Sequence, residues 1–149
     1  MTIVETVRSQ MTAAWKAGDT TRRNTLRLMI AALDNGRIAA GHDLADDESL
    51  KVLQREAKQR RDSIEEFAKG GRDDLVAKER DELGVIEGFL PAQMPEDELR
   101  AIVQSTIAEA GASGPDDLGK VMGPLMGKLA GRADGKLANQ IVRELLAST

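Results

Sequence analysis

Apolar residues recur at intervals of three and four along most of the chain, which is the spacing of helices with one buried face. The first such stretch opens with a capping-box signature, Thr2 followed by Glu5, and ends at Gly18. Its apolar stripe consists of Ile3, Val7, Met11 and Trp15. Because the same period continues to the end of the chain, the pattern predicts an all-α fold.

Three further helices are predicted in the first 90 residues. Asp19 is a suitable cap for the second, whose apolar face is Leu26, Met29, Ile30 and Leu33. The third starts at the acidic residues 46–48 and ends near Lys69. Its predicted inward-facing residues are Leu50, Leu53, Ala57, Ile64 and Phe67. The fourth runs from about Asp73 to Leu90 and buries Leu75, Val76, Leu83, Ile86 and Leu90.

The strongest boundary in the chain lies between Pro91 and Pro95, because two closely spaced prolines favour an extended linker. It separates an N-terminal four-helix subdomain, residues 1–90, from a C-terminal subdomain, residues 96–149. The second subdomain is predicted to have three to four helices. Its expected apolar positions are Leu99, Ile102, Val103 and Ile107 in the first helix and Leu137, Ile141, Leu145 and Leu146 in the last, which Asp134 caps.

Composition limits the chemistry that the chain can perform. The sequence is 41% hydrophobic but only 2% aromatic, which is typical of an aliphatic helical core. It has no Cys, and its one His, His42, lies in a Gly-His-Asp loop. We therefore expect no disulfide, no metal site, no cofactor and no catalytic residue. No apolar run approaches the roughly 20 residues of a membrane span, so we expect a cytoplasmic protein with no membrane partner.

Charge is distributed unevenly along the chain, whose net charge is −4. Residues 62–98 hold twelve acids and four bases, a face that should repel polyanions. Residues 8–37 hold six bases and two acids. The third helix is also basic, but many of its bases have an acid four positions on, such as Arg61 with Glu65. That spacing favours a solvated helix with surface ion pairs.

A glycine-rich segment, residues 119–136, is the most distinctive part of the sequence. Glycines recur every four positions at 119, 123, 127, 131 and 135, so on a helix Gly119, Gly123 and Gly127 form a bare backbone stripe. Each interior Gly costs about 1 kcal/mol relative to Ala, so either a second helix or a bulky ligand should pack closely there. Around the stripe lie Lys120, Lys128, Arg132 and Lys136, against the single acid Asp134. Pro124 should divide the segment into two short helices, at about 116–122 and 124–130.

Several motifs together resemble the GatB/YqeY family. They include Gly-Lys-Val-Met-Gly at 119–123 and Gly-Arg-Ala-Asp-Gly-Lys at 131–136, with further matches at 11–19, 26–30, 58–63, 71–75 and 89–91. The domain occurs alone in YqeY-like proteins and as the C-terminal tail of the B subunit of glutamine-dependent tRNA amidotransferase. The resemblance implies two helical subdomains and a link to tRNA, which that tail contacts. Phe89 and Trp15 depart from the usual Tyr and Met, and we expect them to alter packing only.

These observations predict a non-catalytic module that binds tRNA or another structured RNA through the C-terminal subdomain. The candidate contacts are Lys120, Lys128, Arg132 and Lys136, with Gly123, Gly127 and Gly131 permitting close approach. Recognition would be by backbone and shape, because this segment has no aromatic residue.

Two alternatives remain open at this point. One is a protein-interaction adaptor that docks an amidotransferase subunit or another translation-linked partner. The other, implied by the resemblance alone, is an accessory carbon–nitrogen ligase role with glutamine as amido donor.

Overall fold

The computed structural model describes residues 1–148, which form helices and turns and contain no strand. The prediction of an all-α fold is confirmed. The chain divides into two compact units, Met1–Pro91 and Ala92–Thr149, which are described separately here as the N-terminal and C-terminal units. The predicted role of residues 91–95 as a linker between independent subdomains stays a prediction, and early proteolytic cleavage near Gln93 would test it.

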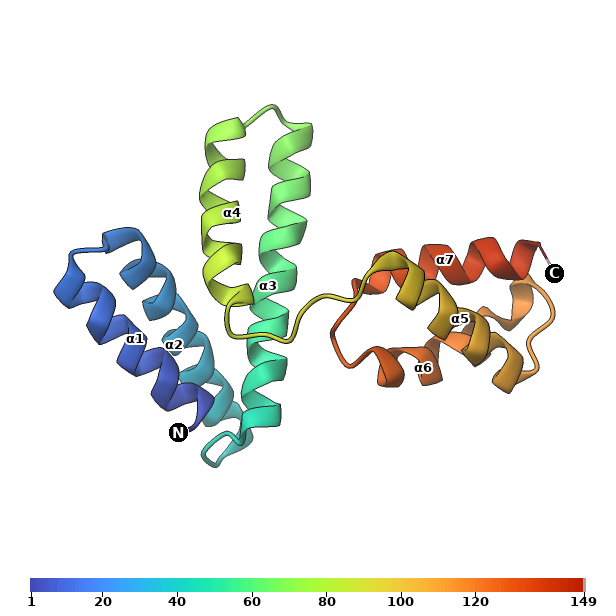
Figure 1. Cartoon of the computed structure of the whole chain (residues 1–149), viewed down its shortest axis with the longest axis horizontal. Coiled ribbons are helices and arrows are strands. Elements are labelled where there is room, and N and C mark those ends of the chain that lie inside the picture. The colour runs from blue at the N-terminus through green and yellow to red at the C-terminus, as the bar shows by residue number, and fades with distance from the viewer. Residues whose placement is uncertain (149) are drawn as a thin grey trace. The chain divides into compact units, whose positions relative to one another are not determined.

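The N-terminal unit contains two helical hairpins (Figure 1). The first joins α1 (Ile3–Ala17) to α2 (Thr20–Ala40), and the second joins α3 (Asp46–Lys69) to α4 (Asp73–Glu87). Helix α2 packs against both α3 and α4. The predicted capping box is confirmed: the Thr2 hydroxyl accepts from the Glu5 N–H at 3.1 Å, and the Glu5 carboxylate accepts from the Thr2 N–H at 3.0 Å.

The core of the N-terminal unit is aliphatic, as its composition predicts. It is built from Val7, Ala14, Leu26, Met29, Ile30, Leu33, Leu53, Ala57 and Ile86. The predicted face of α2 is therefore confirmed, whereas the predicted stripe of α1 is wrong at its end. Ala14 is buried, and Trp15 is 64% exposed. One residue turns a helix by about 100°, so a shift of one position moves Trp15 out of the core.

Several predicted core residues of α3 and α4 are less buried than expected. These residues are only partly buried: Leu50, Ile64, Phe67, Leu75, Leu83 and Leu90. Helix α4 also ends at Glu87, because residues 88–90 form a turn. The reason is geometric: a two-helix hairpin buries one narrow seam, so side chains beside that seam keep part of their surface in contact with water.

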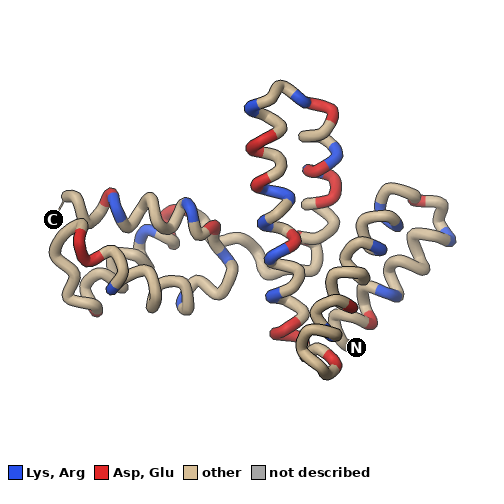
Figure 2. Tube along the Cα trace, turned by 180° about the vertical axis from the view of Figure 1, so that it is seen from behind, with Lys and Arg blue, Asp and Glu red and all other residues tan. Residues whose placement is uncertain are grey.

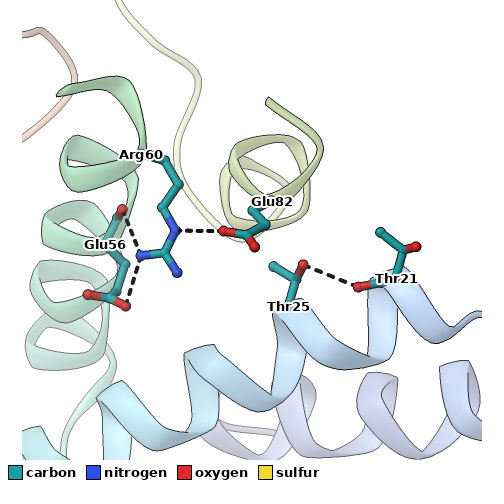
Figure 3. Close-up of polar contacts among 5 residues, drawn as sticks. All are labelled: Thr21, Thr25, Glu56, Arg60 and Glu82. Atoms are coloured by element: carbon teal, nitrogen blue, oxygen red, sulfur yellow. Dashed lines mark hydrogen bonds and ion pairs between the residues drawn. The ribbon is translucent and has the colours of Figure 1, made fainter. Parts of the chain in front are cut away.

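A polar cluster joins α3 to α4 inside the N-terminal unit (Figure 3). Arg60 Nη1 contacts the Glu56 carboxylate at 3.1 Å, and Arg60 Nε contacts the Glu82 carboxylate at 3.3 Å. The Arg60 side chain is only 12% exposed. Nearby, the buried Thr25 donates its hydroxyl to the Thr21 carbonyl at 3.2 Å. The prediction of a solvated helix with surface ion pairs is therefore wrong for Arg60, because its side chain is largely buried and Glu82 of α4 is its second partner.

The C-terminal unit is a three-helix bundle with one 3₁₀ turn among its described residues. It contains α5 (Glu96–Ala110), η1 (Pro115–Asp117), α6 (Leu118–Leu129) and α7 (Gly135–Ala147), and each α-helix packs against the other two. The core consists of Leu99, Val103, Val121, Leu125, Leu129, Ala138, Ile141, Val142 and Leu146. Leu137, predicted to face inward, is 37% exposed, because Ala138 and Val142 occupy the core positions of α7.

Helix α6 is continuous through Pro124, so the predicted break there is wrong. Proline cannot donate to the carbonyl four residues back, which belongs to Lys120. Both Lys120 and Pro124 are exposed, so water can satisfy that carbonyl. On the opposite side Val121, Leu125 and Leu129 are fully buried. Their packing holds the helix together across the missing hydrogen bond.

Candidate functional site

The glycine stripe of α6 is open to solvent. Gly119, Gly123 and Gly127 are all exposed, and a Cβ atom added to any of them would have nothing within 4 Å in the described chain. Within residues 1–148, therefore, no second helix explains these glycines. The interpretation as a tight internal helix–helix contact is wrong, and the stripe remains a surface that a partner's backbone can approach closely.

Lys128 is held by α5 rather than pointing freely into solvent. Its ammonium group lies 2.6 Å from the Glu109 carboxylate and 3.2 Å from the Thr106 hydroxyl. The hydrogen bond and the positive charge of Lys128 lower the pKa of Glu109 below its ordinary value. An incoming phosphate would have to replace Glu109 as the counter-ion of Lys128.

Arg132 fastens the start of the C-terminal unit. Its Nε donates to the Ala92 carbonyl at 3.2 Å, and its own carbonyl accepts from the Met94 N–H at 2.7 Å. The chain is turned for this contact at Ala130 and Gly131, which have φ values of 47° and 77°. The left-handed conformation accounts for glycine at 131, so close approach of a ligand is not needed to explain that residue.

The remaining two candidate cations lie at helix starts. Lys120 is 65% exposed and lies 3.3 Å from the Asp117 carboxylate. The pKa of Asp117 is lowered first by the Ser113 N–H and then by Lys120. Lys136 is the second residue of α7, and its N–H donates to the predicted cap, Asp134, at 3.0 Å. The capping carboxylate occupies the start of α7, where unpaired N–H groups could otherwise bind a phosphate.

The structure thus gives Lys120, Lys128 and Arg132 three different partners: a carboxylate of η1, a carboxylate of α5 and a backbone carbonyl. The prediction that Lys120, Lys128, Arg132 and Lys136 contact RNA stays a prediction. Arg132 is the least suited of the four, because its Nε already donates to the Ala92 carbonyl.

A second basic surface was missed by reasoning from the sequence. A hollow of about 210 Å³ on the α1–α2 hairpin is lined by Met11, Thr12, Trp15, Arg23 and Arg27. We call these five residues the Trp15 surface. Figure 2 shows further basic positions along the same hairpin. The excess of bases in residues 8–37 was a visible signal, but the assignment of Trp15 to the core concealed the aromatic component.

His42 is exposed at the loop before α3, where its ring contacts the Asp43 carbonyl at 2.9 Å and the Glu48 carboxylate at 3.6 Å. Both contacts raise the pKa of His42, the carbonyl being the larger cause. Among residues 1–148 no three His, Asp or Glu side chains are placed to hold a metal ion. No helix in that range is both long enough and apolar enough to cross a membrane.

A known protein family matches nearly the whole length of the chain. The pattern of the Yqey-like protein family matches residues 4–146. The chain belongs to this family. The match takes in all seven α-helices of the described residues, including the glycine stripe and the Trp15 surface.

Curated relatives are mitochondrial proteins from yeasts. The chain is 34% identical over 116 residues to altered inheritance of mitochondria protein 41 of Lachancea thermotolerans. The aligned residues cover 75% of this chain and 62% of that protein. The chain is 36% identical over 93 residues to the protein of the same name from Saccharomyces cerevisiae, covering 62% of this chain and 50% of the relative. The chain therefore spans between half and two thirds of the length of these relatives.

The expectation of a cytoplasmic location is contradicted by this comparison, because the relatives are named as mitochondrial proteins. The lack of a long apolar run carries no information about the compartment. Organelle addresses are amphipathic or receptor-read signals rather than apolar spans, and they are not part of the folded domain.

Proposed function

We propose that the protein is a non-catalytic RNA-binding module that holds a structured RNA such as tRNA against the exposed face of α6. The observation that carries this proposal is the open glycine stripe. Three glycines in one helix are costly, at about 1 kcal/mol each relative to Ala, and nothing in the described chain packs against them. A partner that approaches the backbone closely gives them a use.

RNA is favoured as that partner by the cations beside the stripe. Lys120 follows Gly119 directly and is 65% exposed, so its ammonium group is accessible to a phosphate. Lys128 follows Gly127 and can exchange the exposed Glu109 carboxylate for a phosphate oxygen, since both are oxyanions. The resemblance to the tail of the tRNA amidotransferase B subunit supports the same partner.

The test replaces Lys120, Lys128 and Lys136 together by Glu and measures tRNA affinity at several salt concentrations. Arg132 is left unchanged because it fastens Ala92. We expect the Glu variant to lose binding, since the site changes by six charge units. Ala replacements should weaken binding and reduce the log–log salt slope by roughly 2–3, at about 0.7–0.9 for each lost phosphate contact.

The matched control is the same replacement at Lys51, Arg55 and Lys58, which lie on the exposed side of α3. This variant should bind tRNA like the parent protein, and both variants should retain the helical circular dichroism spectrum. Loss of binding by the α3 variant alone would show that the face has been chosen wrongly. Unfolding of the variant at Lys120, Lys128 and Lys136 would show that these lysines stabilise the fold.

One observation favours a second candidate function, a protein-interaction adaptor. Met126, between Gly123 and Gly127 in the sequence, is 43% exposed, and an apolar side chain beside bare backbone suits a partner helix. The occupant would then be a protein such as an amidotransferase subunit. Salt separates the two functions: RNA binding weakens steeply as salt rises, whereas an apolar helix contact changes little.

A further inference from the structure

Trp15 is placed for contact with a partner. It is the one tryptophan of the chain, and 64% of its surface is exposed. The neighbouring core position of α1 is filled by Ala14, so Trp15 contributes little to the core. A large exposed indole beside a hollow is a surface on which a flat ring can stack.

The arginines beside Trp15 are unpaired. Arg23 and Arg27 stand four residues apart on one face of α2, and in the described chain neither guanidinium makes a hydrogen bond or ion pair. Arg23 Nε is moreover buried without an acceptor. Other arginines of the same hairpin do have partners: Arg8 contacts Asp34 and Arg22 contacts Gln10. The Trp15 surface therefore brings two unpaired guanidinium groups together beside an exposed indole.

The lining of the hollow selects the charge of the ligand. None of its five residues is acidic, two are arginines, and the others are Met11, Thr12 and Trp15. A ligand that satisfies this set needs a flat apolar ring together with oxyanions. A nucleotide has both, because its base can stack on the indole and its phosphate can accept paired hydrogen bonds from a guanidinium.

We propose that the Trp15 surface binds an unpaired nucleotide of single-stranded RNA. The base stacks on Trp15, and Arg23 and Arg27 hold the flanking phosphates. This proposal rests on the proposed function for the choice of RNA over DNA, and it adds a contact on the N-terminal unit that reads unpaired rather than helical RNA. A base within a duplex does not bind here, because its faces are already stacked.

The experiment uses Trp15 itself as the probe, because the chain has one tryptophan and its fluorescence therefore reports on this residue. The full chain is titrated with a short oligouridylate and, separately, with an RNA duplex of the same length. We expect the single strand to quench the fluorescence and the duplex to leave it unchanged. Replacing Arg23 and Arg27 by Gln should weaken binding of the single strand and reduce the log–log salt slope by about 1.4, at roughly 0.7 for each phosphate.

Binding of a labelled oligouridylate, followed by anisotropy, tests the stacking contact. Trp15→Ala should weaken binding at least about fivefold, whereas Trp15→Phe retains a ring and should recover most of the affinity. The matched control replaces Lys78 and Arg80 by Gln, since both are exposed on α4. That variant should bind like the parent protein.

Each outcome separates this proposal from the proposed function. If tRNA binding depends on Lys120, Lys128 and Lys136 but the oligouridylate leaves Trp15 fluorescence unchanged, the Trp15 proposal is overturned and the proposed function stands. If the oligouridylate quenches Trp15 but the variants at Lys120, Lys128 and Lys136 bind tRNA normally, the Trp15 proposal stands and the proposed function is overturned. Equal quenching by a polyglutamate peptide would overturn the nucleotide assignment in favour of an acidic protein partner.

Discussion

The two basic surfaces of this protein differ in what their cations contact. On the Trp15 surface, Arg23 and Arg27 make no hydrogen bond or ion pair within the described chain. In the glycine-rich segment, by contrast, Lys128 is bound to Glu109 and Arg132 to the Ala92 carbonyl. The two regions look alike when charges are counted along the sequence, and they differ because the surrounding chain supplies partners to Lys128 and Arg132 and not to Arg23 and Arg27.

What a basic surface can bind depends on how many of its charges are unpaired, and not on how many it holds. An unpaired guanidinium gains a full charge-assisted hydrogen bond from a phosphate. A lysine already paired at the surface gains only the difference between two oxyanions, and such pairs are worth about 0–1 kcal/mol. Variants that remove paired or unpaired residues should therefore differ in their effects.

The largest effect is expected at Arg60, the most enclosed paired arginine of the α3–α4 hairpin. Replacing Arg60 by Ala leaves Glu56 and Glu82 without their shared counter-ion in a site where all three side chains are less than a fifth exposed. We expect the free energy of unfolding to fall by about 2–4 kcal/mol, slightly less than for fully buried pairs. Urea unfolding followed by circular dichroism measures this loss.

The matched control for Arg60 is Arg27→Ala, which removes an unpaired arginine and should change the free energy of unfolding by no more than about 0.5 kcal/mol. The contrast between paired and unpaired arginines would collapse if the two variants unfolded at the same urea concentration.

A smaller effect, of opposite sign, is expected on the glycine stripe. Because a Cβ at Gly119 or Gly127 meets nothing within 4 Å, Ala at each position should stabilise α6 by about 0.5–1 kcal/mol. If the stripe binds RNA, the same variants should bind tRNA more weakly while melting at a higher temperature. Gly131→Ala is the control, and it should destabilise the protein because φ there is 77°. Stabilised variants with unchanged tRNA affinity would remove α6 as the binding face.

The smallest effect concerns the Lys128–Glu109 pair. The pKa of Glu109 is lowered in the folded protein, so the pair stabilises the fold above the ordinary pKa of a glutamate. That contribution is lost as the pH falls through the lowered pKa. Lys128→Met should return the pKa of Glu109 towards its ordinary value, which a carboxyl NMR titration measures. An unchanged pKa would mean that Lys128 is free in solution and equivalent to the unpaired arginines.

Much of the fold could be predicted because helical periodicity and caps are local. The Thr2–Glu5 capping box, the Asp134 cap and the buried face of α2 were all visible in the sequence. Predictions failed where distant residues decide. Pro124 was expected to break α6, and Trp15 was expected in the core. Both errors come from treating a helix in isolation from the surface against which it packs.

The sequence indicated where the candidate site lies, but it could not predict which groups the basic side chains of that site contact. The recurring glycines and lysines of residues 119–136 marked the segment, because their spacing is a property of the chain itself. The partners of Lys128 and Arg132 lie 19 and 40 residues away, so no local pattern could reveal them. The Trp15 surface was missed for the same reason, since it exists only where α1 and α2 meet.

The helices, their caps and the aliphatic composition of the core follow from the amino-acid sequence, because each depends on residues within one or two turns of the same helix. The pairing of the cations, the exposure of the glycines and the side of α1 that meets solvent follow from tertiary packing alone. Those properties depend on the groups that other helices bring within hydrogen-bond distance, or fail to bring. Helical periodicity gives the direction of a side chain around its own axis, and only packing determines what lies in that direction.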